Sequence, residues 1–146
     1  MTEYKRVFLD TNPIIYYLQH NAEFGDTVKE FLIATRKEKA QFVSSDVTIE
    51  EYCVYPYREK NTALIDSFER FVSLSEMEIV HTSEAIAKKA AQIRAEFTAF
   101  KAMDSLQLAT AIISGCDYFL TNDKQLQQFT EIKVQLVRDL GASSTE

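Results

Sequence analysis

One stretch near the start of the chain constrains the fold more than any other: residues 6–18, which read RVFLDTNPIIYYL. Its β-branched and aromatic VFL run predicts a short buried strand. The residues that follow favour a helix start, because Thr11 or Asn12 can cap a helix and the next residue, a proline, suits its first position. Asp10 should therefore lie at the carboxyl end of the strand, the edge where open α/β sheets bind ligands. A plain solvated carboxylate is the alternative, since Asp is common in such turns.

Composition narrows the class of protein. The 146 residues fit one domain with a sizeable core, and 46% of them are hydrophobic, which excludes a disordered chain. Asp and Glu number 22 against 16 Lys and Arg, for a net charge of −6. This balance argues against a basic nucleic-acid coat protein but allows an enzyme with a metal in an acidic pocket. No apolar run reaches membrane-span length and no signal-peptide core is evident, so we expect a cytoplasmic protein without a membrane partner.

Apolar runs and segments of helical periodicity alternate along the chain. Strands are expected at residues 6–9, 41–44, 78–80, 118–121 and 134–137. Helices are expected at residues 13–19, 25–37, 46–54 (stopped by a proline at 56), 61–74, 84–97, 102–113 and 124–128. Such alternation predicts a single α/β domain over residues 1–140, with a parallel sheet of about five strands and helices on both faces. The small residues 141–146 are expected to form a short flexible tail.

Acidic residues occupy positions that the predicted fold brings together. Asp10 and Asp123 each follow an apolar strand, and Asp104 falls in the first turn of a strongly apolar helix. Glu50 or Glu51 falls early in another helix, and the residues alone do not choose between them. The two helix positions also have a plainer interpretation. An acid in the first turn, such as Asp104, stabilises a helix through its dipole, and Thr48-x-x-Glu51 matches a capping box.

Gathered carboxylates would repel one another and raise each other's pKa, and a divalent cation removes that penalty. Oxygen ligands without a His or Cys cluster suit Mg²⁺ or Mn²⁺ rather than zinc. The two histidines and two cysteines lie apart, and better fit surface or packing roles. Three glycines cannot supply a phosphate-binding loop, and no Ser-His-Asp order or nucleophile elbow occurs. The residues therefore predict a cation site made by acids.

Four short motifs occur in an order and spacing that resemble the PIN domain family, and within it the VapC-type ribonuclease toxins. They are LDTN at 9–12, SSDVTIEE at 44–51, KAMDSLQLATA at 101–111 and FLTND at 119–123. The resemblance spans residues 6–137, nearly the whole chain. It implies a five-stranded parallel sheet flanked by helices and Mg²⁺- or Mn²⁺-dependent endonuclease activity on RNA, with one or two cations.

The resemblance also assigns roles to residues. It implies four catalytic, metal-binding carboxylates: Asp10, Glu51, Asp104 and Asp123. It selects Glu51 over Glu50 because Ser45 and Thr48 match the family's tSxxtxxE pattern. It implies four supporting polar residues that orient water or phosphate: Thr11, Asn12, Thr121 and Asn122. Lys101 and Lys124 lie within three residues of expected ligands, so we predict that they contact the RNA backbone.

The family resemblance further implies protein partners. Five tyrosines, with two phenylalanines nearby in sequence, cluster around the first and third helices: Tyr16, Tyr17, Tyr52, Tyr55 and Tyr57. Most should belong to the core, but the resemblance suggests a groove here for an antitoxin helix, and a homodimer whose two sites face a shared cleft. Two other functions are compatible with the same motifs and carboxylates. One is a catalytically silent PIN-like module that binds RNA or protein, and the other is a DNA-directed nuclease or phosphatase using the same carboxylates.

Overall fold

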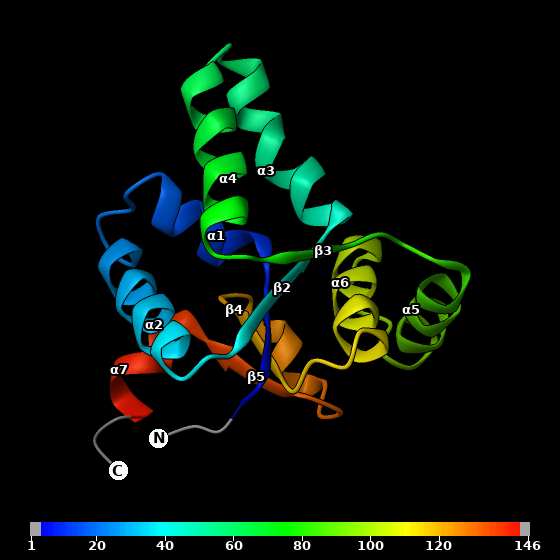
Figure 1. Ribbon diagram of the computed structural model, residues 1–146. Helices are drawn as coiled ribbons and strands as arrows, with labels where there is room; N and C mark the ends of the chain where they lie inside the picture. Colours follow the sequence, from blue (N-terminus) through cyan, green and yellow to red (C-terminus); the bar gives the residue numbers. More distant parts are fainter. Residues whose placement is uncertain (1–3, 144–146) are drawn as a thin grey trace.

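A computed structural model describes residues 4–143 of the chain as a parallel β-sheet wrapped by helices (Figure 1). The five strands are β1 (Arg6–Leu9), β2 (Gln41–Ser45), β3 (Glu78–Val80), β4 (Tyr118–Thr121) and β5 (Lys133–Leu136). They lie in the order β3-β2-β1-β4-β5, and every neighbouring pair is parallel. The predicted five-stranded parallel sheet is therefore confirmed.

Helices connect the strands and cover both faces of the sheet. They are α1 (Thr11–Leu18), α2 (Gly25–Lys37), α3 (Asp46–Arg58), α4 (Thr62–Leu74), α5 (Glu84–Glu96), α6 (Ala102–Ile113) and α7 (Leu140–Ser143), with 3-10 turns η1 (Lys124–Gln128) and η2 (Val137–Asp139). No helix within the described residues is long and apolar enough to cross a membrane.

Successive side chains of β1 divide the core in two, as the alternation of a strand requires. Phe8 faces α5 and α6 and stacks on Phe119 of β4, with ring centroids 5.1 Å apart. Val7 and Leu9 face the opposite way, toward α1, α2, α3 and α4. Because the central strand is buried on both sides, its backbone is fixed where it delivers Asp10 to the edge of the sheet.

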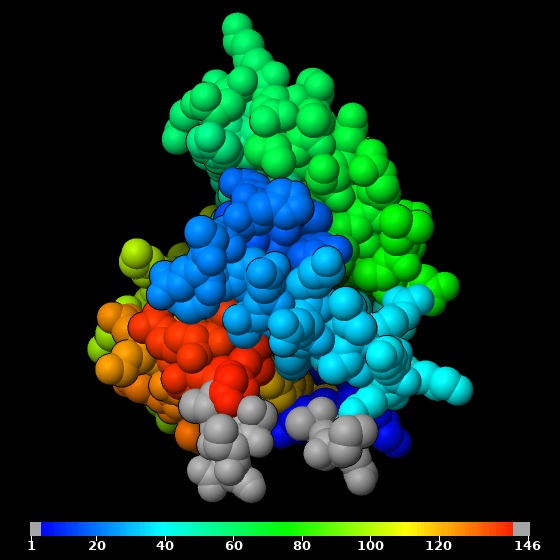
Figure 2. All heavy atoms as spheres, turned by 90° about the vertical axis from the view of Figure 1, so that its left-hand side faces the viewer, coloured from blue at the N-terminus to red at the C-terminus, as the bar shows by residue number. Residues whose placement is uncertain are grey.

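Helices α3 and α4 form an arm, here called the α3–α4 arm (residues 46–74), that projects beyond the sheet (Figure 1). A view from another side shows the same segment standing out from the rest of the molecule (Figure 2). The two helices are held together by Tyr52, whose ring stacks on Phe68 at 4.8 Å and whose hydroxyl donates to the Leu64 carbonyl at 2.9 Å. Only part of the surface of α3 is buried by this packing, which leaves its outer half open to solvent.

Two helix boundaries differ from those predicted. Helix α1 is capped by Asp10, whose carboxylate accepts the Thr11 backbone N–H at 2.9 Å, so neither Thr11 nor Asn12 is the cap. Helix α3 runs through Pro56 to Arg58 instead of ending near residue 54. Proline removes one hydrogen bond there, but Pro56 is buried, and packing outweighs the loss in the last turns of the helix.

The carboxyl-terminal segment begins with a short helix, and the expectation of a flexible tail over residues 141–146 stays a prediction. Helix α7 begins at Leu140 and continues to residue 143. The Leu140 side chain packs against the core cluster on the α1–α4 face of the sheet. The expected tail residues 144–146 lie outside the described residues.

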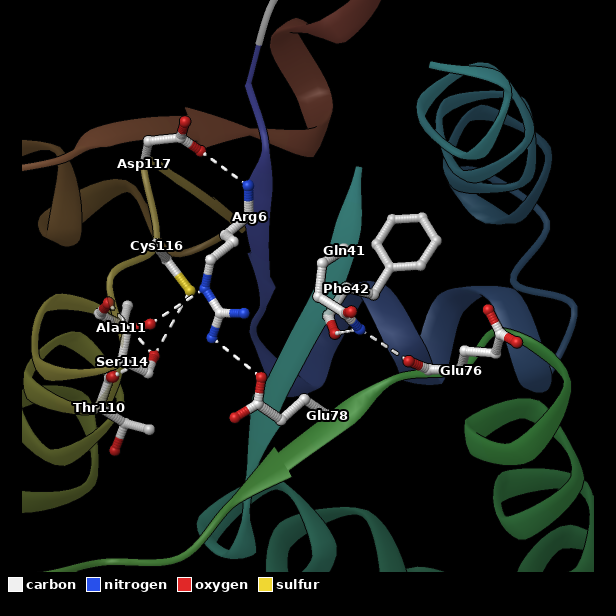
Figure 3. Close-up of polar contacts among 10 residues, drawn as sticks. All are labelled: Arg6, Gln41, Phe42, Glu76, Glu78, Thr110, Ala111, Ser114, Cys116 and Asp117. Carbon is white, nitrogen blue, oxygen red and sulfur yellow. Dashed lines mark hydrogen bonds and ion pairs between the residues drawn. The ribbon is translucent and has the colours of Figure 1, made fainter. Parts of the chain in front are cut away.

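The amino ends of the strands are tied together by polar contacts (Figure 3). The Arg6 guanidinium donates to Glu78 Oε1 and to the Ser114 carbonyl, both at 3.0 Å. Asp117 accepts the backbone N–H groups of Lys5 and Arg6 at 3.0 and 3.1 Å. Glu78 and Asp117 at this end therefore each face a cation or an N–H donor.

Candidate active site

The opposite, carboxyl end of the sheet contains a cleft of about 410 Å³. It lies where the connections from β1 and β4 leave the sheet on either side of the reversal in strand order, the usual position for a ligand site in an open α/β sheet. The cleft is lined by all four predicted carboxylates, Asp10, Glu51, Asp104 and Asp123. Its remaining lining residues are Thr11, Asn12, Ile15, Glu50, Val54, Met103 and Gln107. Residues far apart in sequence are thus brought to one place.

Asp10 is the most firmly held of the four. Its carboxylate accepts three hydrogen bonds, from the Thr11 backbone N–H at 2.9 Å, the Thr121 hydroxyl at 2.7 Å and the Gln107 amide at 3.1 Å. Burial raises its pKa to about 6, with a smaller contribution from the negative charge of Glu51, and the hydrogen bonds only partly oppose this. The ionised form at neutral pH would therefore be stabilised by a nearby cation.

Glu51 reaches into the cleft from the first turns of α3. Its Oε1 accepts the Thr11 hydroxyl at 2.6 Å, which ties α3 to the start of α1. The cap of α3 is Ser45, whose hydroxyl accepts the Thr48 backbone N–H at 3.3 Å, so the capping-box alternative for Glu51 is wrong. Glu50 also lines the cleft, but its side chain is more exposed than that of Glu51.

Asp104 and Asp123 complete the acidic lining. Asp104 accepts the Lys101 backbone N–H at 3.1 Å, so it stabilises the start of α6 as well as facing the cleft. Partial burial raises its pKa, and the charge of Asp123 adds to that rise. Asp123 accepts the Gln125 backbone N–H at 3.1 Å at the start of η1. Each carboxylate is thus positioned by backbone or side-chain hydrogen-bond donors, and the positive charge of Lys101 partly opposes the rise in the pKa of Asp104.

None of the ion pairs formed within residues 4–143 involves these four carboxylates. Nor does that range contain a group of three or more His, Cys, Asp or Glu side chains that are close enough together to hold a metal ion by themselves. Mg²⁺ does not need such a group, because it usually keeps several waters and binds one or two carboxylates directly. The all-oxygen donor set fits Mg²⁺ or Mn²⁺ held partly through water, with further ligands supplied by a phosphate.

A buried polar network beneath the cleft was missed by the sequence reasoning. Gln107 donates its amide to Asp10 and, at 2.7 Å, to the Thr48 hydroxyl, and its carbonyl accepts the Ser45 hydroxyl. The residue is 2% exposed. The signal was present in the sequence LQLATAI, where one glutamine interrupts an apolar helix. A buried amide with all its partners satisfied orients Asp10 and specifies one packing of α6 on α3.

The four polar residues predicted to support the site differ in how close they lie to its carboxylates. Thr11 and Thr121 contact carboxylates directly, and Asn12 is an exposed part of the cleft lining. Asn122 is buried away from it, with its amide donating to the Tyr16 hydroxyl at 3.2 Å and its carbonyl accepting the Arg138 backbone N–H at 3.1 Å. Asn122 thus joins β4 to α1 and η2, and it is not among the residues that line the cleft.

The two lysines predicted to contact RNA lie near the site but outside its lining. Lys101 is the residue before α6, and Lys124 is the first residue of η1. Both side chains are exposed, and no ion pair or hydrogen bond of the described residues engages either ammonium group. Each is therefore free to meet a phosphate at the rim, which leaves the prediction open.

Comparison with known proteins identifies the family of the chain. The sequence profile of the PIN domain matches residues 7–132. Because the match covers most of the chain, the protein belongs to the PIN domain family, as its motifs predict. No curated protein sequence matches the chain.

Solved toxin–antitoxin complexes contain chains of the same fold. One is VapBC2 from Rickettsia felis bound to a DNA fragment from their promoter, with a TM-score of 0.75, 18% identity and coverage of 90% of this chain and 98% of that one. Another is a toxin–antitoxin complex from Klebsiella pneumoniae, with a TM-score of 0.67, 22% identity and coverage of 86% and 94%. FitAcB from Neisseria gonorrhoeae has a TM-score of 0.68, 20% identity and coverage of 88% and 95%. At these identities the similarity establishes the shared fold.

Proposed function

We propose that this PIN domain protein is a Mg²⁺- or Mn²⁺-dependent endoribonuclease that hydrolyses RNA phosphodiester bonds, and that it is the VapC-type toxin of a toxin–antitoxin pair. The observation that carries the proposal is the gathering of four carboxylates in one cleft, where none of them forms an ion pair with a described residue. Such a cluster is unfavourable by itself and becomes favourable when it binds a divalent cation and, through it, a phosphate. The family membership supports the same class of reaction.

Asp10, Glu51, Asp104 and Asp123 would hold the cation, partly through water. When bound, the cation lowers the pKa of a water molecule and neutralises charge on the phosphate. The chain itself orients these carboxylates. Gln107 and Thr121 donate hydrogen bonds to Asp10, and Thr11 donates one to Glu51. Ile15, Val54 and Met103 add apolar side chains to the lining of the cleft, and apolar surroundings strengthen the electrostatic interactions of nearby carboxylates. Lys101 and Lys124 would contact neighbouring phosphates at the rim.

The direct test compares labelled RNA and DNA as substrates, with Mg²⁺ and with chelator, for the wild type and Asp10→Asn. We expect metal-dependent internal cleavage of RNA by the wild type alone. Preferential cleavage of DNA would replace the proposal with a DNA nuclease. Retention of RNA without cleavage, unchanged by chelator, would replace it with a binding module.

A second groove supports the proposal of a protein partner. It lies between α2 and α4, beside the end of α1, and has a volume of about 840 Å³. Its floor is apolar, with Leu32, Phe42 and Phe71, and exposed Leu74 lies at its edge. In a chain of net charge −6, the groove is lined by three basic residues outside the ion pairs of the described residues and by one acid, Asp26, while a fourth basic residue, Arg36, pairs with Glu76 at 3.1 Å; the three are Lys29, Lys37 and Arg70. We infer that it receives an apolar segment of an antitoxin flanked by acidic residues.

This location differs from the groove expected around the first and third helices. Tyr17 lines the observed groove, whereas Tyr16 packs on Phe24 and Tyr52 packs on Phe68 inside the core. Co-purification with the product of the neighbouring open reading frame tests the partner. The charge reversal Arg70→Glu should weaken that complex, and equal retention of both proteins would contradict this use of the groove.

The homodimer remains a proposal of its own. A dimer with facing clefts would bring together two acidic sites along one bound RNA. Light scattering at micromolar concentration tests it, and a stable monomer there would remove it.

A further inference from the structure

We propose that Arg138 is a positioning residue of the cleft that the four carboxylates line, here called the carboxylate cleft. Through Asn122 it holds the turn between β4 and η1 so that the Asp123 carboxylate faces the cleft. This inference rests on the proposed function and deepens it, because it adds to the site a residue outside the four sequence motifs. Arg138 also lies beyond residues 7–132, which match the PIN domain profile, so family membership by itself gives it no role.

The direction of the Asp123 side chain depends mainly on the backbone of its turn. Two residues, Asn122 and Asp123, join the end of β4 at Thr121 to the start of η1. Among the described residues the Asp123 carboxylate accepts one hydrogen bond, from the Gln125 backbone N–H, whereas the carboxylate of Asp10 accepts three. Because Asp123 has so few partners of its own, its carboxylate points where the turn directs it.

The peptide group between Asn122 and Asp123 is held from both sides. Its N–H, which belongs to Asp123, donates to the Thr121 hydroxyl at 3.1 Å, and that hydroxyl in turn donates to Asp10. Its carbonyl, which belongs to Asn122, accepts Nη2 of Arg138 at 3.0 Å. Since a peptide group is planar, these two contacts fix the plane from which the Asp123 side chain departs.

Arg138 holds the side chain of Asn122 as well as its main chain. Its Nε and its backbone N–H both donate to Asn122 Oδ1, at 3.2 and 3.1 Å. The Asn122 amide donates in the other direction, to the Tyr16 hydroxyl of α1 at 3.2 Å, and the residue is 6% exposed. A guanidinium can reach the side chain and the main chain of one residue at once because its N–H donors form a rigid planar fork.

Arg138 is itself firmly placed, because it follows the end of β5. Leu136, the last residue of that strand, lies beside Thr121 in the parallel register of β4 and β5. The next residue, Val137, is 1% exposed and belongs to the core cluster on the α1–α4 face of the sheet. No ion pair of the described residues engages Arg138, so no carboxylate there competes for its guanidinium. The sheet and the core therefore hold Arg138 beside the turn.

Mn²⁺ affinity of the protein without substrate separates a positioning role from an effect of charge, because the two have opposite signs. Arg138→Gln removes a positive charge, which by electrostatics alone would tighten the binding of a cation. If Arg138 positions Asp123, the same change should weaken Mn²⁺ binding about tenfold. Arg138→Lys keeps the charge but loses the planar fork, and it should weaken binding to a similar extent. Arg94→Gln is the matched control and should bind like the wild type, because Arg94 is exposed on α5 and forms no ion pair with a described residue.

A double variant tests whether the effect passes through Asp123. In an Asp123→Asn background the carboxylate to be positioned is absent, so Arg138→Gln should weaken Mn²⁺ binding little further. Tyr16→Phe removes the contact on the other side of Asn122 but keeps the ring that packs on Phe24. It should weaken Mn²⁺ binding in the same direction and by less than Arg138→Gln, and it provides a milder variant should Arg138→Gln not fold.

Hydrogen exchange followed by mass spectrometry gives a measurement that needs no metal. Three backbone N–H groups have their acceptors in the turn, those of Asp123, Gln125 and Leu126. Arg138→Gln should speed the exchange of these amides, because opening of the turn exposes them to solvent, and should leave the amides of β2 unchanged.

Four results would overturn the role of Arg138: unchanged or tighter Mn²⁺ binding in Arg138→Gln, wild-type binding in Arg138→Lys, fully additive losses in the double variant, or unchanged exchange in the turn. Faster exchange throughout the sheet would also overturn it, by assigning Arg138 to the stability of the whole domain. A wild type that binds Mn²⁺ but cleaves no RNA would remove the proposed function alone, and the binding and exchange measurements would still decide the role of Arg138.

Discussion

The two ends of the parallel sheet hold acidic side chains in different settings. At the amino end Glu78 pairs with Arg6 at 3.0 Å, and Asp117 accepts two backbone N–H groups (Figure 3). At the carboxyl end four carboxylates line one cleft and none of them forms an ion pair with a described residue. The first arrangement is complete without a ligand. The second leaves a raised pKa at Asp10 that a nearby positive charge would lower, and this difference is why we propose a functional role for the acids of the cleft and a structural role for Glu78 and Asp117.

The largest expected effect comes from removing a carboxylate at the cleft. Asp10→Asn keeps the shape of the side chain but replaces one acceptor oxygen with an NH₂ donor and removes the negative charge that would face the proposed cation. We expect RNA cleavage to fall by roughly a hundredfold or more, since even residues that only support a metal ligand cost about 10–100-fold when replaced. Circular dichroism should show an intact fold. Near-normal activity in this variant would place the chemistry elsewhere.

The buried amide beneath the cleft should matter nearly as much. Gln107→Leu removes one of the hydrogen-bond partners of each of the Ser45 and Thr48 hydroxyls and removes a donor from Asp10. We expect about 1–3 kcal/mol less stability in urea unfolding and a drop in activity of about 10–100-fold. Gln92→Leu, on the exposed surface of α5, is the matched control and should change neither quantity. Equal behaviour of the two variants would show that the network has no role.

A third prediction concerns pH. Because the pKa of Asp10 is raised to about 6 in the folded protein from 3.8, the folded state binds more protons than the unfolded state between these values. The free energy of unfolding of the metal-free protein should therefore fall as pH rises from about 4 to above 6, by at most about 3 kcal/mol. Chemical denaturation in chelator across this range measures the slope. Asp10→Asn should flatten it, and an unchanged slope in that variant would assign it to other groups.

The smallest effect is expected at the amino end. Glu78→Gln removes an ion pair whose side chains are 30% and 49% exposed. Exposed pairs contribute little, so stability should change by about 1 kcal/mol or less, and metal binding and cleavage should not change. A loss of activity here as large as at Asp10 would show that the two ends are not functionally distinct.

Local sequence patterns were sufficient for the sheet and most helices. The strands β1 and β4 are short apolar runs that end at polar turn residues, and the helices between them repeat apolar residues at helical spacing. The predicted cap of α1 was wrong because Asp10, Thr11 and Asn12 can all cap a helix. Tertiary hydrogen bonds from Thr121 and Gln107 to Asp10 decide among them. A proline in the last turns of α3 was mistaken for a stop for a related reason, since packing between helices is not visible in the local pattern.

The carboxylate cleft was largely predictable, whereas its surroundings were not. Parallel strands place Asp10 and Asp123 on the same edge whatever the details of the fold, but Glu51 was chosen over Glu50 only through family resemblance. The role of Gln107 depends on which face of α6 points at the cleft, and that follows from packing of α6 on α3 and α5. For the same reason the tyrosine cluster did not locate the second groove, because counting aromatic residues does not tell which rings pack together.

The most direct test of the account is cation binding to the protein without substrate. Titration calorimetry with Mn²⁺ and Mg²⁺ compares the wild type with Asp10→Asn at the carboxyl end and Asp117→Asn at the amino end. We predict that the wild type and Asp117→Asn bind with the same affinity and that Asp10→Asn binds at least about tenfold more weakly. Equal binding by all three proteins, or by none of them, would contradict a cation site at the carboxylate cleft.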